Sequence, residues 1–124
     1  MDNENFRKQF TKRLYQFALK LISLIETFPK NDIVCKRIGD QLLRSGTSII
    51  GNYVEGASAS STKDFLNYQN TCLKSTNESK LWICLLHDSK KIKTENADWY
   101  LNELNEFSKI FSSSIITLKK KIKR

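Results

Sequence analysis

Hydrophobic residues recur at every third or fourth position along most of the chain, which is the spacing of one face of an α-helix. The first stripe predicts a helix over residues 4–28 and consists of Phe6, Phe10, Leu14, Phe17, Leu21, Leu24 and Phe28. The last stripe predicts a helix over 95–122 and consists of Tyr100, Leu104, Phe107, Phe111, Ile115, Leu118 and Ile122. Stripes of the same period predict two further helices, over 32–55 and 62–89.

Residues that begin or end helices separate these stripes. Pro29 disfavours a helical conformation at the residue before it and ends the first helix, while Asp32 is suited to cap the second. Gly56 suits the left-handed turn that often follows a helix. Ser61, with an aspartate three residues later, predicts the start of the third helix, and Thr94 is expected to cap the fourth.

Four amphipathic helices joined by short connections bury their hydrophobic stripes together as a bundle. The sequence therefore predicts an all-α fold, an up-down-up-down antiparallel four-helix bundle, with residues 1–124 forming one domain. One proline and four glycines are too few for the frequent turns of a β-sandwich or β-barrel.

The composition also bears on location and redox state. The first ten residues are polar, which argues against a secretory signal peptide, and no segment approaches the roughly 20 apolar residues of a membrane span. We therefore expect a cytoplasmic protein without membrane contact. The odd set of Cys35, Cys72 and Cys84 has no close pair, which indicates reduced thiols and no metal or other cofactor.

The charge is expected to gather at one end of the bundle. Lys and Arg number 21 against 13 Asp and Glu, a formal net charge of +8. In the predicted topology the start of the first helix, the end of the last and the connection between the second and third lie together. We call this end the basic pole; its cations are Arg7, Lys8, Lys12, Arg13, Lys63, Lys119, Lys120, Lys121, Lys123 and Arg124. The acids expected beside them are Asp2, Glu4, Glu55 and Asp64.

Such a pole favours contacts with the phosphate backbone of RNA or DNA without sequence specificity. A solvated basic tail with no ligand is the alternative that the same residues allow. Phe6 and Phe10 belong to the core stripe, so we do not expect them to stack on bases.

The second helix has an unusual composition. Gly39, Gly46 and Gly51 each cost about 1 kcal/mol relative to alanine inside a helix. The first two lie seven residues apart on one face, where a missing side chain lets another helix approach closely. Small polar residues form seams on the second and third helices, which we expect to face outward and to mediate self-association. This oligomer interface is predicted to contain Gln41, Arg44, Ser45, Ser48, Asn52, Glu55, Thr71, Ser75 and Glu78.

One segment resembles a known protein family. Residues 41–56, QLLRSGTSIIGNYVEG, are followed by a small polar loop, by Lys63 and Phe65, and then by Ser75 and Glu78. The arrangement resembles bacterial four-helix bundle proteins first noticed as open reading frames in intervening sequences of large-subunit ribosomal RNA genes. Their pattern is roughly Q-L-x-R-A-x-x-S-I-x-x-N-I-A-E-G, then K-x-F, then S-x-x-E. The chain departs from this pattern at Ser45, Gly46, Ile50, Tyr53 and Val54.

The resemblance implies a homo-oligomer, a barrel-shaped pentamer, with no catalytic activity. The family includes the accessory variability protein of diversity-generating retroelements, which is similar in fold, binds nucleic acid and associates with a reverse transcriptase. The partners implied are therefore further copies of the chain, RNA or DNA, and a reverse transcriptase or another protein.

The residues alone also give no complete catalytic signature. Cys84 and His87 supply two metal ligands where a site needs three or four. Asn52 and Glu55 are expected to tie the end of the second helix to the loop by hydrogen bonds. Two alternatives to a nucleic-acid-binding protein stay open: a protein-interaction scaffold, and a metal-dependent nuclease that uses Glu55 or Glu78.

Overall fold

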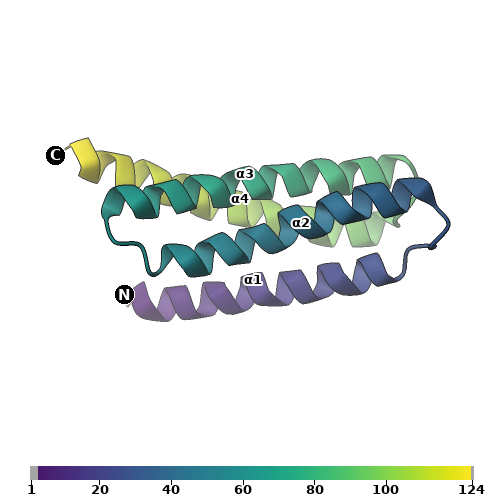
Figure 1. Cartoon of the computed structure of the whole chain (residues 1–124), viewed down its shortest axis with the longest axis horizontal. Helices are drawn as coiled ribbons and strands as arrows, with labels where there is room; N and C mark the ends of the chain where they lie inside the picture. Colours follow the sequence, from purple (N-terminus) through teal and green to yellow (C-terminus); the bar gives the residue numbers. More distant parts are fainter. Residues whose placement is uncertain (1–2, 124) are drawn as a thin grey trace.

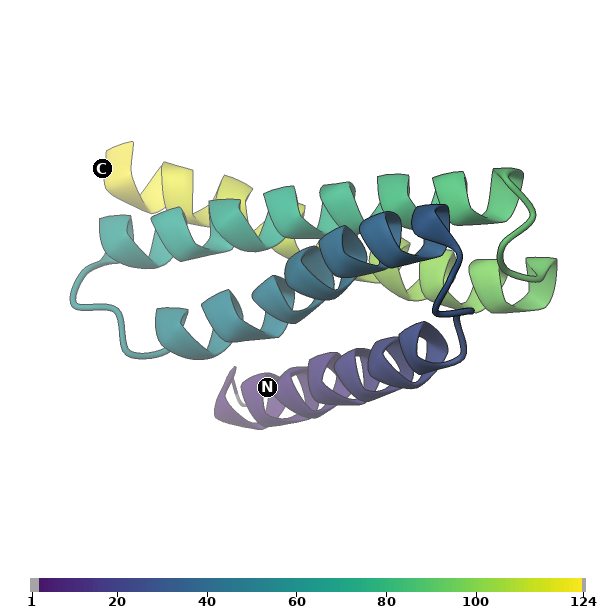
Figure 2. The ribbon, with the colours of Figure 1, turned by 45° about the vertical axis from the view of Figure 1, so that its right-hand side comes forward.

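The computed structural model describes residues 3–123 as four helices in antiparallel order (Figure 1). The helices are α1, Asn3–Glu26; α2, Ile33–Gly56; α3, Thr62–Asp88; and α4, Thr94–Lys123. The first turns of α1, the last turns of α4 and the α2–α3 loop lie at one end, and the other two loops lie at the opposite end (Figure 2). The predicted all-α four-helix bundle is confirmed, with every helix boundary within two residues of its prediction.

Local hydrogen bonds account for the predicted helix starts and for the earlier end of α1. Oδ1 of Asp32 accepts from the amides of Val34 and Cys35 at 3.0 and 3.1 Å, and Oγ of Ser61 accepts from the amide of Asp64 at 3.0 Å. Helix α1 ends two residues before its predicted end, because the amides of residues 27 and 28 bond to carbonyls only three residues back. This tighter turn leads into Pro29.

Gly56 and Thr94, which were predicted to supply a left-handed turn after α2 and to cap α4, have other roles in the structure. Gly56 ends α2, but no glycine among residues 3–123 has a positive φ. A Cβ atom on Gly56 would lie 3.0 Å from Cβ of Tyr68, so the close approach of α3 accounts for the glycine. Thr94 is the first residue of α4, and its hydroxyl lies 3.0 Å from Nε2 of His87. The side chain of Thr94 therefore links α4 to the end of α3 instead of capping the new helix.

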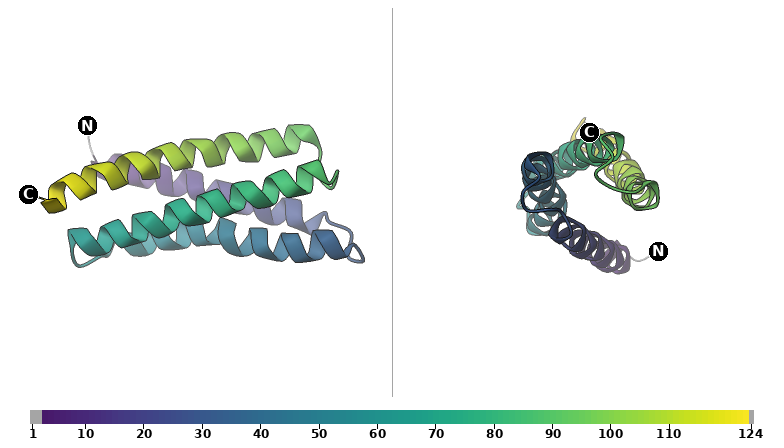
Figure 3. Two further views of the ribbon diagram at one scale, coloured as in Figure 1. Left: turned by 90° about the horizontal axis from the view of Figure 1, so that it is seen from above. Right: turned by 90° about the vertical axis from the view of Figure 1, so that its right-hand side faces the viewer.

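Aromatic side chains close the bundle between α1 and α4. Backbone packing is closest between neighbours in the chain, and seen end-on the ribbons of α1 and α4 stand apart (Figure 3). Phe10 and Phe17 of α1 lie 5.7 and 5.3 Å from the ring of Phe107, measured between centroids. Tyr100 donates a hydrogen bond of 2.7 Å to the carbonyl of Lys20. We call the buried rings that fill this space the aromatic cluster: Phe10, Phe17, Tyr53, Tyr100, Phe107 and Phe111.

The helix α2 glycines differ in their surroundings. A Cβ atom on Gly46 would lie 2.2 Å from Cδ2 of Leu21, and one on Gly39 would lie 3.3 Å from the ring of Phe28. The predicted close approach of another helix is therefore confirmed for Gly46, and that helix is α1, whereas the close neighbour of Gly39 is Phe28 in the turn after α1. At Gly51 a Cβ atom would meet nothing within 4 Å.

This contrast predicts opposite effects of the same substitution. Gly51→Ala should raise the free energy of unfolding by about 0.5–1 kcal/mol, because alanine is the better helix former. Gly46→Ala should lower it by about 1–3 kcal/mol, because the added methyl group would displace the side chain of Leu21, which is fully buried. Urea denaturation of both variants measures the difference, and stabilisation by Gly46→Ala would contradict the packing described.

Asp32 also connects two distant parts of the chain. Its Oδ2 lies 2.8 Å from Nζ of Lys91 in the α3–α4 loop. The bond to Lys91, followed by the two backbone amides, lowers the pKa of Asp32 to about 2 from an ordinary 3.8. The ionised carboxylate thus holds the loop against the start of α2.

A carboxylate whose pKa is lower in the folded than in the unfolded state stabilises the fold. This stabilisation is complete above the unfolded-state pKa and is lost as the pH falls through the folded-state pKa. We expect Asp32→Asn to reduce stability at neutral pH, since asparagine keeps the cap but not the charge. The difference from the wild type should shrink between about pH 4 and pH 2. Thermal denaturation across this range measures it, with Asp40→Asn, an exposed carboxylate of the same helix, as the control. A difference independent of pH would contradict the role of the charge.

Candidate nucleic-acid interface

The structure brings the predicted cations to one end of the bundle. The side chains of Arg7, Lys8, Lys12 and Lys63 are exposed at this pole. The tail lysines, which we define as Lys119, Lys120, Lys121 and Lys123, are exposed beyond the last buried residue of α4, Leu118. Asp2 and Arg124 lie outside the described residues.

Arg13 differs from the other cations because a carboxylate already holds it. Its Nε and Nη2 donate to the two oxygens of Glu103 on α4 at 3.0 and 2.5 Å, and its guanidinium lies 5.5 Å from the ring centre of Phe107. The ion pair joins α1 to α4 across the aromatic cluster. With Glu103 included, nine described cations face four carboxylates, an excess of five positive charges.

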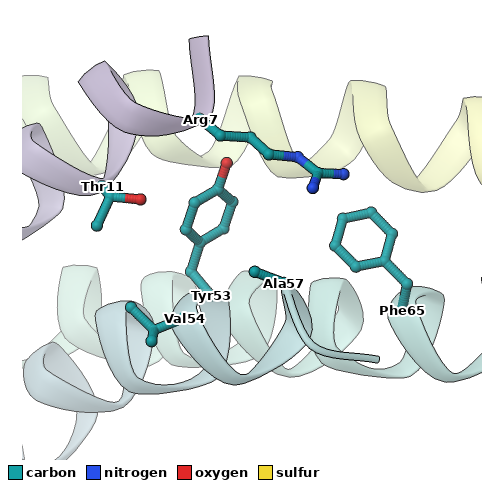
Figure 4. Close-up of a pocket in the computed structure, with 6 residues that line it drawn as sticks. All are labelled: Arg7, Thr11, Tyr53, Val54, Ala57 and Phe65. Carbon is teal, nitrogen blue, oxygen red and sulfur yellow. The ribbon is translucent and has the colours of Figure 1, made fainter. Parts of the chain in front are cut away.

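Arg7 spans a small pocket at the pole. Its guanidinium lies 5.6 Å from the ring centre of Phe65, a distance suited to a cation–π contact. The pocket below has a volume of about 170 Å³ and is lined by Tyr53, Val54 and Ala57 as well as these two residues (Figure 4). Burial raises the pKa of Tyr53, so its ring and hydroxyl stay neutral. Arg7 therefore ties α1 to the start of α3 and keeps its charge at the surface.

Phe6 was predicted to lie in the core, but the structure places it at the surface. Its side chain is 39% exposed, while that of Phe10 is 3% exposed and belongs to the aromatic cluster. Residues 4–9 of α1 are all exposed, so the core stripe begins only at Phe10. The prediction that both rings are buried is right for Phe10 and wrong for Phe6.

The small polar seams of α2 and α3 meet within the same chain. The hydroxyls of Ser45 and Ser79 lie 2.8 Å apart, and Ser75 donates to Ser48 at 3.0 Å. Ser45 and Ser75 are buried, so the prediction that the seams face outward is wrong for these two residues. The hydroxyls allow α2 and α3 to pack closely while each polar group keeps a hydrogen bond.

The other members of the predicted oligomer interface border this seam. Arg44 bonds to Gln41 at 3.0 Å and to Glu78, and Trp82 donates to Glu78 at 3.0 Å. The Asn52 amide donates to the carbonyl and hydroxyl of Ser48, both at 2.9 Å, so it bonds within α2 and not to the loop. Exposed side chains remain at Gln41, Arg44, Glu55 and Thr71.

Groups with nucleophilic or metal-binding chemistry are scattered over α2 and α3, and His87 and Asp88 are in contact. Burial raises the pKa of the Cys72 thiol to about 12, and Cys35 is also buried. Cys84 is exposed on α3, and His87 contacts Asp88 and Thr94. Within residues 3–123, no three His, Cys, Asp or Glu side chains are placed to hold a metal ion. In the same part of the chain, no helix has the length and apolar character needed to cross a membrane.

The helix order, the aromatic cluster and the basic pole define a small all-α four-helix bundle protein with a polarised charge. Residues 7–113 match the 23S rRNA-intervening sequence protein family. The chain belongs to this family, so the resemblance seen in residues 41–56 is confirmed.

A solved structure supports the same assignment. It is that of a protein with unknown function from the S23 ribosomal protein family of Bacteroides thetaiotaomicron. The two chains are 30% identical and superpose with a TM-score of 0.78, covering 88% of this chain and 96% of the other. No curated protein sequence is significantly similar to this chain.

Proposed function

We propose that this protein is a non-enzymatic accessory protein that binds RNA or DNA through backbone phosphates at its basic pole. The observation that carries the proposal is the convergence of cations from three separate segments of the chain on one end of the bundle. Each phosphate neutralised by a lysine or arginine releases counterions, which is a favourable and salt-dependent contribution to affinity.

The tail lysines are the strongest part of this surface. They extend along the last turns of α4, where all residues from 119 to 123 are exposed. Arg7, Lys8, Lys12 and Lys63 add charge from the other two segments. Arg13 contributes less than its position in the sequence indicates, because Glu103 neutralises it.

Replacing the four tail lysines by glutamine should weaken binding to nucleic acid and make it less dependent on salt. The slope of log affinity against log salt should fall by roughly one for each phosphate that the variant no longer neutralises. Fluorescence anisotropy with a labelled oligonucleotide measures both quantities. The matched control replaces Lys30, Lys36, Lys90 and Lys93, which are exposed at the opposite end of the bundle.

Equal weakening by both quadruple variants would show that total charge matters and that the pole does not. Absence of binding by the wild type at about 50 mM salt would remove the proposal. In that case the protein-interaction scaffold would be the better account, with the cations serving solubility.

The second part of the proposal is self-association. Large hydrophobic side chains are exposed along α1 and α2, and those considered for this contact are Tyr15, Leu19, Ile22, Leu43 and Val54, between 36% and 56% exposed. We call this surface the α1–α2 face. Tyr15, Leu19 and Ile22 follow helical spacing along α1, and Val54 of α2 lines the same pocket as Thr11 of α1.

An apolar surface of this kind is typical of protein–protein contacts. It is a better candidate for self-association than the α2–α3 seam, whose serines are occupied inside the chain. The number of five copies rests on the family resemblance. A pentamer would bring together five basic poles and strengthen attraction for a polyanion. A reverse transcriptase or another protein is the alternative occupant of the same face.

A charged substitution on the α1–α2 face should dissociate the oligomer. We expect the wild type to sediment as a pentamer and the Leu19→Glu, Val54→Glu double variant to sediment as a chain of 14.4 kDa. The control is the double variant Leu81→Glu, Ile116→Glu, because these residues are as exposed but lie on α3 and α4. A wild type that stays monomeric at high concentration would rule out self-association.

A further inference from the structure

The ring of Phe6 presents an aromatic surface at the basic pole in a fixed orientation. It stacks on Phe10, with the ring centroids 5.7 Å apart and the planes inclined by 21°. Phe10 is itself held by Tyr53, Phe107 and Phe111 of the aromatic cluster. One side of the Phe6 ring is therefore supported by the core, and the remaining 39% of the side chain faces solvent.

A groove begins at this ring and follows α4. Its volume is about 570 Å³, and besides Phe6 it is lined by Lys109, Ile110, Ser113, Ser114, Thr117 and Leu118. The ammonium group of Lys109 lies 3.3 Å from a carboxylate oxygen of Glu106. Phe6 and Ser114 also line a smaller cavity that continues beneath α1 to Arg7 and Phe65. An aromatic ring thus lies beside serine and threonine residues, at the end of the molecule with excess positive charge.

We infer that this groove binds a single-stranded segment of nucleic acid, with one unpaired base stacked on Phe6. Base stacking on an aromatic side chain tolerates any sequence, because every base has a π-face. Serine and threonine hydroxyls donate readily to phosphate and sugar oxygens, and the tail lysines lie further along the same helix. The inference rests on the proposed function and specifies its ligand.

Two observations favour a single strand over other occupants. The bases of an intact duplex are paired and stacked inside the helix, so they cannot cover an isolated ring on a protein surface. A second copy of the chain would have to bring its own positive charge to the groove, whereas a polyanion complements it. The surface better suited to a second copy, the α1–α2 face, lies on another side of α1.

The test compares Phe6→Ala with the wild type on three ligands of about 20 nucleotides: oligo-dT, oligo-U, and a duplex of dT with dA. The wild type should bind the single strands more tightly than the duplex. Phe6→Ala should weaken single-strand affinity about 10-fold or more and leave duplex affinity unchanged. Phe6→Tyr should keep the affinity, since it keeps the ring. Ile116→Ala removes a more exposed hydrophobic group outside the groove and should have no effect.

A second measurement does not depend on a variant. Ultraviolet cross-linking of the wild type to 5-iodouracil-substituted oligo-U should join the base to the peptide that contains Phe6. Equal affinity for duplex and single strand, unchanged affinity of Phe6→Ala, or cross-links confined to the tail would each overturn the inference while leaving backbone binding intact. A change in sedimentation of Phe6→Ala without weaker binding would assign the groove to a second copy. Absence of binding to all three ligands would instead remove the proposed function.

Discussion

Contacts between the rings of α1 and α4 are the interaction on which the rest of the structure depends. The backbones of these two helices stand apart, so only long side chains can close the bundle between them. The aromatic cluster fills this space, and the Tyr100 hydroxyl and the Arg13–Glu103 pair fix α1 at two further points. On the other side of α1, Gly46 lets it approach α2 closely, and Gly39 leaves room for Phe28 just after α1. Large side chains on one flank and missing ones on the other together determine where α1 lies.

The position of α1 in turn determines the composition of the basic pole. Because Phe10 is the first buried ring of α1, the two turns before it extend past the core and expose Phe6 and Arg7. The segment that matches the family, residues 7–113, contains the whole aromatic cluster but ends before the tail lysines. The match thus covers most of the bundle, and the most basic part of the proposed interface lies beyond it.

The sequence predicted the features that depend on periodicity and local chemistry. Helical stripes, the Asp32 and Ser61 caps and the close approach at Gly46 follow from spacing and residue type. The hydrophobic stripe shows which face of a helix is buried but not whether the bundle turns to the left or to the right. Contacts made by the two sides of that face with neighbouring helices were therefore not predictable. For this reason the serines around Ser45 were expected at the surface, and the partnership of Arg13 with Glu103 was not foreseen. Phe6 was misplaced for a related reason, since periodicity does not show where along a helix its neighbours end.

The end of α4 has a thermodynamic consequence for any anionic ligand. Between Leu118 and residue 123 no further side chain is buried, and helical turns without buried side chains are only marginally stable in water. Lys119 and Lys123 lie one turn apart and repel each other, although positive charge near a carboxyl terminus also interacts favourably with the helix dipole. Phosphates placed among these ammonium groups would remove the repulsion and keep the last turn from fraying. Binding of an anion to the tail lysines and formation of the last helical turn would therefore favour each other.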